Sequence, residues 1–236
     1  MKILAVDSSG LVASVALVED DNLIAEYTVH YKKTHSQTLL PMLDEIVRMT
    51  ETQLSETDAI AVAAGPGSFT GLRIGAATVK GLGLALEKPI IGIPTVEALA
   101  MNLYGAGGVI CPLMDARRNQ VYTGIYRFVD GALVIIKDSC AVALEEILNE
   151  LNAMGEPVSF LGDGVAVYKE QIEQLLGVPH QYAPAHVNKQ RASAVAVCAL
   201  RRLAEGVCES ADAFSPVYLR LSQAERERKE RELNEQ

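Results

Sequence analysis

The sequence AIAVAAGPGSFTGLRIG at residues 59–75 carries the clearest structural signal in the chain. Its apolar run over 59–64 ends at a glycine, which is typical of a parallel strand covered on both faces. The glycine-rich turn that follows leads into a helix predicted over 72–86. A second strand and a second helix come directly afterwards. This alternation of strand and helix predicts an α/β protein.

A β-hairpin with a carboxylate at its tip precedes this stretch, and the same pattern recurs later. Two short strands are predicted over 2–18, and the first of them ends at Asp7. Residues 109–126 repeat this hairpin, with Asp115 at the matching place 108 residues further on. The Gly-x-Gly that begins at Gly65 recurs 97 residues later. We therefore predict a duplicated mixed sheet with flanking helices, arranged as two lobes with a cleft between them.

The glycine-rich segment 105–108 is the expected boundary between the lobes. We predict an N-terminal lobe over 1–104 and a C-terminal lobe over 105–222, with a helix near 191–205 that packs back on the first lobe. Residues 223–236 are nearly all Glu, Arg and Lys, so this tail is expected to be a solvated helix or disordered. A further helix is predicted from residue 34 or 36 to about 49, with Pro41 either kinking it or marking its true start.

Charge and composition exclude several classes of ligand. Lys and Arg number 21 against 30 Asp and Glu, so the formal net charge is -9 and polyanions are repelled at long range. Aromatic residues make up only 5% and Trp is absent, which leaves few platforms for stacking bases or sugar rings. No run approaches the roughly 18 apolar residues of a membrane span, and Asp7 interrupts the apolar start. We expect a cytoplasmic protein that does not hold nucleic acid by itself.

Cysteine and histidine usage argues against a metal site. The four Cys include no C-x-x-C pair, which fits reduced thiols better than a zinc knuckle or a redox dithiol. The four His are isolated, so no metal ligands are predicted. His35 and Ser36 are adjacent, but neighbouring side chains rarely face each other and no G-x-S-x-G is present. A serine or cysteine hydrolase is therefore not expected.

The hairpin tips are candidates for binding a phosphate. The first tip could offer backbone N–H groups to a phosphate while its Asp holds a metal ion or water. The same Asp can equally cap its own turn. The recurrence of an Asp at the second tip favours phosphate binding over turn capping, because two facing carboxylate hairpins flank a nucleotide phosphate in sugar kinases, actin and the heat-shock ATPases. The candidate residues of the nucleotide or phosphate loops are Asp7, Ser8, Ser9, Gly65, Gly67, Ser68 and Asp115.

The glycines of the 65–75 segment allow two interpretations. Gly65 and Gly67 would let the backbone approach a ligand closely, and Ser68 or Thr70 can cap the helix that follows. Neither a Walker loop nor a dinucleotide fingerprint is present, so tight packing remains the alternative. Further along, small residues recur at 71, 75, 78 and 83. They would leave one helix face almost without side chains, which lets another helix approach closely.

Arg117 and Arg118 at the second hairpin tip form the one compact basic feature. As solvated turn residues they would have no specific role. As ligand contacts they would bind a phosphate or a partner's carboxylate.

Five segments together resemble the bacterial TsaB (YeaZ) family, and the resemblance runs from Met1 to about Arg220. The segment GPGSFTGLRIG is highly specific for this family. The five are ILAVDSS at 3–9, HSQTLLP at 35–41, GPGSFTGLRIG at 65–75, MDAR at 114–117 followed by VY at 121–122, and PVYLR at 216–220.

The resemblance implies a two-lobed actin-like ATPase fold of the ribonuclease H-like kind. It also implies a non-catalytic subunit that acts with the transferase TsaD to form N6-threonylcarbamoyladenosine in tRNA, from threonylcarbamoyl-AMP. The small ATPase TsaE joins them, and tRNA is reached indirectly through the complex. No cofactor is implied for this chain alone, whereas ATP or ADP is conceivable at its interface with TsaD. A homodimer is conceivable when TsaD is absent.

The comparison with TsaD bears on catalysis. TsaD holds its metal with a His-x-Glu-x-His motif, and the matching residues here are Thr95, Glu97 and Leu99. Leu has no lone pair and Thr is a poor ligand at neutral pH, so this chain is not expected to carry out the transfer. The expected contacts with TsaD lie on the helix near residue 35 and on the glycine-bearing helix. These interface candidates are His35, Leu39, Leu43, Gly71, Arg73, Gly75, Thr78 and Leu82.

Two other functions remain as alternatives. The paired Asp7 and Asp115 would suit an ATP-dependent small-molecule kinase of the actin-like class, although the chain is short for one. A glycoprotease-like metallopeptidase ranks last, because the stretch 95–99 lacks the ligands for its metal.

Overall fold

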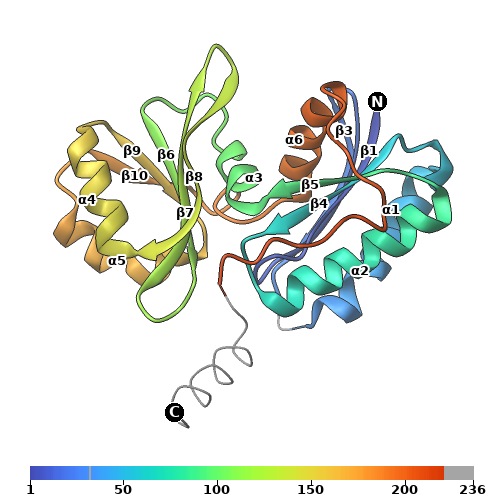
Figure 1. The fold of residues 1–236 in the computed structure, drawn as a ribbon, viewed down its shortest axis with the longest axis horizontal. Coiled ribbons are helices and arrows are strands. Elements are labelled where there is room, and N and C mark those ends of the chain that lie inside the picture. Colours follow the sequence, from blue (N-terminus) through green and yellow to red (C-terminus); the bar gives the residue numbers. More distant parts are fainter. Residues whose placement is uncertain (32, 221–236) are drawn as a thin grey trace, which may run out of the picture.

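The protein consists of two β-sheets that lie side by side with helices on their faces (Figure 1). The structure is a computed structural model, and it describes residues 1–31 and 33–220. The predictions for the tail at 223–236 fall outside these residues. In the part of the chain that the structure describes, no helix is long and apolar enough to cross a membrane.

The first sheet has the strand order β3-β2-β1-β4-β5. Strands β1 and β2 form an antiparallel hairpin in which Asp7 is opposite Ser14, whereas β4 runs parallel to both β1 and β5. The strands are β1 (Lys2–Asp7), β2 (Ala13–Glu19), β3 (Asn22–Val29), β4 (Ala59–Gly65) and β5 (Ile90–Pro94).

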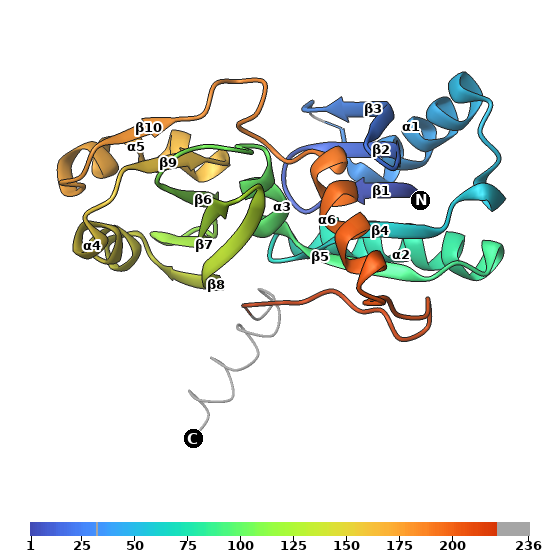
Figure 2. The same cartoon turned by 90° about the horizontal axis from the view of Figure 1, so that it is seen from above.

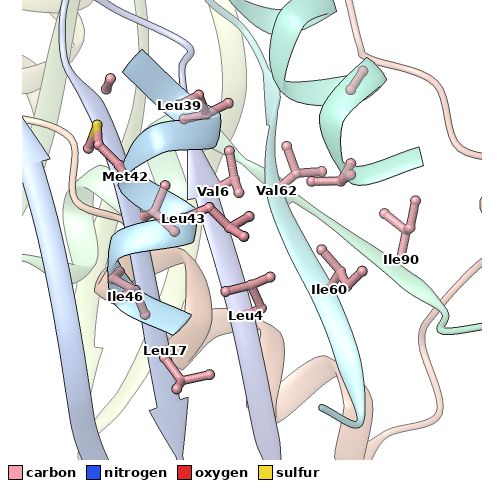
Figure 3. Packing of buried hydrophobic residues seen from close by; sticks show 14 of the residues in the cluster. Leu4, Val6, Leu17, Leu39, Met42, Leu43, Ile46, Ile60, Val62 and Ile90 are labelled. Carbon is pink, nitrogen blue, oxygen red and sulfur yellow. The ribbon is translucent and has the colours of Figure 1, made fainter. Parts of the chain in front are cut away.

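Helices cover both faces of this sheet, which explains why its central strands are apolar over residues 3–6 and 59–64. Leu4 and Val6 of β1 face α1 and α2, whereas Ile3 and Ala5 face α6 on the other side. Figure 3 shows the first of these interfaces, where the apolar stripe of α1 packs on β1, β2 and β4. The helices are α1 (His35–Thr50), α2 (Phe69–Leu86) and α6 (Ala192–Ala204), and a short 3-10 helix spans Leu54–Glu56.

The second sheet repeats the first. Strands β6 to β10 correspond, in chain order, to strands β1 to β5. With this correspondence its strand order, β10-β9-β6-β7-β8, is the same as that of the first sheet. Helices α4 and α5 cover one face and α3 the other. The elements are α3 (Thr95–Met101), β6 (Val109–Asp115), β7 (Gln120–Val129), β8 (Ala132–Ala143), α4 (Leu144–Met154), β9 (Val158–Leu161), α5 (Asp163–Leu175) and β10 (His180–Tyr182).

Each half of the chain lends one helix to the other half. Helix α3 follows the last strand of the first sheet, yet its residues Val96 and Leu99 pack on β6 and β7 of the second sheet. Helix α6 follows the second sheet, yet Val195 and Ala199 pack on the first (Figure 2). The two lobes therefore exchange a helix across their boundary.

Two predicted helix boundaries differ from those observed. Helix α1 runs without a break through Pro41, which is exposed, so this proline neither starts the helix nor ends it. Helix α2 begins at Phe69 rather than at residue 72, because the Ser68 hydroxyl accepts the Gly71 N–H at 3.3 Å and caps the helix there. The prediction that Ser68 or Thr70 caps this helix is confirmed for Ser68.

Candidate functional site

The candidate site is the cleft where the turns of the two lobes face each other. Its volume is about 640 Å³, and residues of both halves line it. The β1–β2 turn, the start of α2 and the end of the described chain contribute from one side, and the β6–β7 turn contributes from the other. The main polar lining residues are Ser9, Ser68, Thr70, Asp115, Arg117, Tyr122, Asp163, Tyr218 and Arg220.

At the end of β1, Asp7 is buried behind this cleft, with only 1% of its surface exposed. Its Oδ1 accepts the backbone N–H of Ser9 at 2.9 Å and the Ser9 hydroxyl at 2.6 Å, while Oδ2 has no hydrogen-bond partner. Burial raises the pKa of Asp7 to about 6, although the bonds from Ser9 and the nearby His35 lower it in part. Asp7 thus caps its own turn and keeps one carboxylate oxygen free.

This burial predicts an unusual pH dependence of stability. The pKa of Asp7 is higher in the folded chain than its ordinary value of 3.8, so the folded state binds the proton more tightly. Its contribution to stability is complete below about pH 4 and is lost as the pH rises through about 6. The Asp7→Asn variant lacks this titrating group. We therefore expect its free energy of unfolding, relative to that of the parent, to increase by about 2 kcal/mol between pH 4 and pH 7. Urea denaturation across this range measures the shift, and parallel pH profiles would contradict it.

The glycines of α2 pack against the β1–β2 turn. A Cβ at position 71 would lie 2.1 Å from the carbonyl oxygen of Ser8, and one at position 75 would lie 2.5 Å from its hydroxyl. The Ser8 hydroxyl donates to the Gly71 carbonyl at 2.8 Å. The prediction that Gly71 and Gly75 present a bare face to another subunit is therefore wrong, because a turn of the same chain already fills that face.

The loop between β4 and α2 is also in close contact with the chain itself. A Cβ on Gly67 would lie 2.3 Å from the Ser9 carbonyl oxygen, which accepts the Ser68 N–H at 2.7 Å. Gly65 has a φ of 118°, and a Cβ there would lie 2.2 Å from the carbonyl oxygen of Val217. Gly162, its counterpart in the second half, likewise has a φ of 108°. Close packing accounts for Gly65 and Gly67 without a ligand.

The β6–β7 turn is held by its own carboxylate. Asp115 accepts the N–H of Arg117 at 2.7 Å and the hydroxyl of Tyr168 at 3.1 Å. Burial and, to a smaller extent, the bond to Asp115 together raise the pKa of Tyr168 to about 12. Across the turn, Asp163 has a raised pKa because it is buried. Asp115 and Asp7 therefore have equivalent roles, each receiving the N–H two residues further along its turn.

The residues matched to the metal-binding motif of TsaD, Thr95, Glu97 and Leu99, all lie in α3. Thr95 and Leu99 are both fully buried in α3, and the Thr95 hydroxyl has no hydrogen-bond partner. Glu97 is bound to Arg202 of α6 at 2.9 Å, and burial raises its pKa against the effect of this arginine. Among residues 1–31 and 33–220, no group of three or more His, Cys, Asp and Glu could hold a metal ion.

The interface candidates on α1 and α2 separate into buried and accessible residues. Leu39 and Leu43 are 1% and 6% exposed and belong to the core of the first lobe, so their assignment to a partner surface is wrong. The apolar stripe of α1 faces its own sheet (Figure 3). His35 is half-buried and its Nε2 lies 2.9 Å from the Gly10 carbonyl oxygen. Arg73 is exposed, and the remaining candidates, Thr78 and Leu82, are half-buried.

The segment 217–220 also lines the cleft, although the sequence predicted no role for it there. Val217 donates its N–H to the Ala64 carbonyl at 2.7 Å, and the ring of Tyr218 lies 4.8 Å from that of Phe69. Arg220 donates to the Ala116 carbonyl in the other half. The only sequence signal was the motif PVYLR, which lies outside any predicted helix or strand.

The repeated sheet, the exchanged helices and the two facing turns define a two-lobed protein of the actin-like class, with the α/β architecture expected from the sequence. Over residues 22–228, the sequence matches the family described as TsaD, tRNA N6-adenosine threonylcarbamoyltransferase. It is 36% identical to the tRNA threonylcarbamoyladenosine biosynthesis protein TsaB of Bacillus subtilis over 227 residues, which cover 95% of this chain and 96% of that protein.

Two further relatives agree. TsaB of Escherichia coli is 34% identical over 152 residues, covering 64% of this chain and 65% of that protein. The solved structure of YeaZ from Pseudomonas aeruginosa has a TM-score of 0.77 at 28% identity, covering 92% of this chain and 99% of that chain. The chain belongs to the TsaB (YeaZ) family, as its sequence motifs predicted.

Proposed function

We propose that this chain takes part in the formation of N6-threonylcarbamoyladenosine in tRNA, as a non-catalytic subunit that works with a TsaD transferase. The observation that carries the proposal is the match to a TsaB protein along nearly the whole length of both chains. A cytoplasmic location accords with this role. The net charge of -9 supports an indirect contact with tRNA, through the complex rather than through this chain.

The non-catalytic part of the proposal is supported by the surroundings of α3. At the positions that match the histidines of TsaD, Thr95 and Leu99 are buried and offer no nitrogen ligand. Glu97 is engaged by Arg202, which competes with a metal for the carboxylate. We propose that the transfer itself takes place on TsaD.

A nucleotide would be expected between the lobes of a protein of this class, with backbone N–H groups of the turns bound to its phosphates. The N–H of Ser9 is donated to Asp7, that of Ser68 to Ser9, and that of Arg117 to Asp115. These three N–H groups are already bonded within the chain, which argues against a phosphate at these positions. We propose that this chain has no cofactor on its own, and that any ATP or ADP of the complex lies at the junction with TsaD.

We propose that TsaD contacts the solvent-facing sides of α1 and α2, which pack against each other. Leu40 and Leu84 are each 55% exposed there, and Met49 is 66% exposed. On α2, Ala77 and Gly81 are also exposed, and their small size would let a helix approach closely. The same face would serve a homodimer when TsaD is absent, and TsaE would join the assembled pair.

Gly81 allows a direct test of this surface. A Cβ at position 81 meets nothing within 4 Å, so Gly81→Trp adds bulk without disturbing the fold. We expect at least about a tenfold loss of TsaD copurified with the variant, since a tenfold change corresponds to only about 1.4 kcal/mol. Gly107→Trp is the matched control, because this glycine is equally open and lies in the connection between the halves. An undiminished complex with Gly81→Trp would place the interface elsewhere.

The proposed function is tested by deleting the gene in the source organism and analysing the nucleosides of its tRNA. We expect the threonylcarbamoyl modification to disappear and to return with a plasmid copy of the parent chain. Complementation by a Thr95→Ala variant would show that position 95 has no ligand role. Persistence of the modification in a strain without a second copy would reject the proposal.

A further inference from the structure

The last described residues form a continuous segment along the first lobe, which we call the C-terminal strap and define as residues 209–220. Glu209 exchanges two backbone hydrogen bonds with Ile90 of the edge strand β5, at 2.8 and 2.9 Å. Phe214 is inserted into the core and is only 2% exposed. Lys80 of α2 donates to the Phe214 carbonyl at 2.9 Å. The strap, red in Figures 1 and 2, is thus fastened to the first lobe over most of its length.

The end of the strap enters the cleft. Val217 pairs with Ala64 at the end of β4, next to the glycine whose missing Cβ makes room for the strap. Tyr218 packs on Phe69 at the first turn of α2, and the guanidinium of Arg73 lies 4.0 Å from the centre of the Phe69 ring. These contacts fix the direction in which the strap leaves the first lobe.

Beyond this point the strap crosses to the second lobe. The Nη1 of Arg220 donates to the Ala116 carbonyl and lies 3.4 Å from that of Arg117. The residues it reaches begin the β6–β7 turn, in which Arg117, Arg118 and Asn119 have φ values of 61°, 57° and 55°. Three successive non-glycine residues in the left-handed region need support from their surroundings. A guanidinium bound to two carbonyl groups at the start of the turn provides that support.

We propose that the C-terminal strap is an intramolecular clamp that sets the position of the second lobe relative to the first. It spans the same cleft that a bridging ligand would have to span in a two-lobed protein. The chain itself crosses between the lobes twice, within residues 95–108 and near residues 183–191. These two crossings are bonded to each other, because the Asn102 side chain donates to the carbonyls of Val187 and Lys189 at 3.1 and 2.7 Å. The packing of α3 and α6 also joins the lobes. Arg220 adds a connection on the cleft side, which can be removed without cutting either crossing.

Two shortened chains test the clamp. One ends at Pro216 and lacks the cleft end of the strap, and its control ends at Arg220 and lacks only residues 221–236. We expect the chain ending at Pro216 to exchange its amide hydrogens at residues 116–120 at least about tenfold faster than the chain ending at Arg220, and to have a larger radius of gyration than that control in X-ray scattering. The chain ending at Arg220 should match the full chain in its amide exchange at residues 116–120.

Substitution within the full-length chain distinguishes a clamp from local packing. Arg220→Ala should accelerate exchange at the β6–β7 turn and leave residues 64–69 unchanged, and Arg220→Lys should restore part of the protection. Unchanged exchange at 116–120 in Arg220→Ala would overturn the proposal. So would faster exchange confined to residues 64–69, with unchanged scattering, in the chain ending at Pro216. None of these readouts depends on TsaD, so they stand apart from the proposed function.

Discussion

Gly71→Ala is expected to destabilise the first lobe by about 3 kcal/mol or more, although alanine is the better helix former. The added Cβ would lie 2.1 Å from the Ser8 carbonyl oxygen and 3.3 Å from the Ser68 Cβ. Both neighbours are held in place, because Ser8 follows a central strand and Ser68 caps the helix. Either the β1–β2 turn or the start of α2 must move. Urea denaturation followed by circular dichroism measures the loss.

Gly81→Ala in the same helix is the matched control. Nothing lies within 4 Å of the new methyl group, so removing a helical glycine should raise the free energy of unfolding by about 0.5 to 1 kcal/mol. The two substitutions are chemically identical and should have opposite signs. Equal effects would show that α2 does not pack on the β1–β2 turn as described.

Leu39→Ala is expected to lower the free energy of unfolding by about 2 to 5 kcal/mol, because Leu39 is 1% exposed and lies among core residues of α1, β1 and β4. Its neighbour Leu40 is 55% exposed, so Leu40→Ala should change stability by no more than about 0.5 kcal/mol. If α1 contributes to the partner surface, Leu40→Ala should instead reduce the amount of TsaD that copurifies.

Measuring both properties for both variants separates folding from binding. Thermal or urea denaturation reports the first property, and copurification at equal concentrations of folded protein reports the second. A stable Leu39→Ala variant that loses its partner would restore the original assignment of this residue to the interface.

The sequence predicted the architecture well where a pattern was local and repeated. The apolar run at 59–64, the two Asp-tipped hairpins and the glycine at position 162 each follow from strand burial or from turn geometry, which neighbouring residues determine. The duplicated α/β fold could therefore be derived before any comparison, and the family motifs identified the family correctly.

For the interface candidates, the sequence did not show which part of the structure covers them. An apolar stripe at helical spacing indicates that a helix face is covered, but it does not say what covers it, so Leu39 and Leu43 were assigned to a partner instead of to the sheet beneath. The glycines of α2 posed the same problem, since a bare face suits a turn as well as a helix. The strap was missed because its contacts join residues about a hundred or more apart and it has no periodic pattern.

The exchange of α3 and α6 between the lobes has a consequence for how the chain is made. One face of the first sheet, with Ile3, Ala61 and Ile91, is covered by α6, and that helix ends at Ala204. During synthesis this apolar face is complete about a hundred residues before its cover exists, and the chain emerges from its N-terminus at only about 5–20 residues per second. The first half therefore spends several seconds as an incomplete lobe with an exposed apolar surface. During this time it is prone to premature association with another chain.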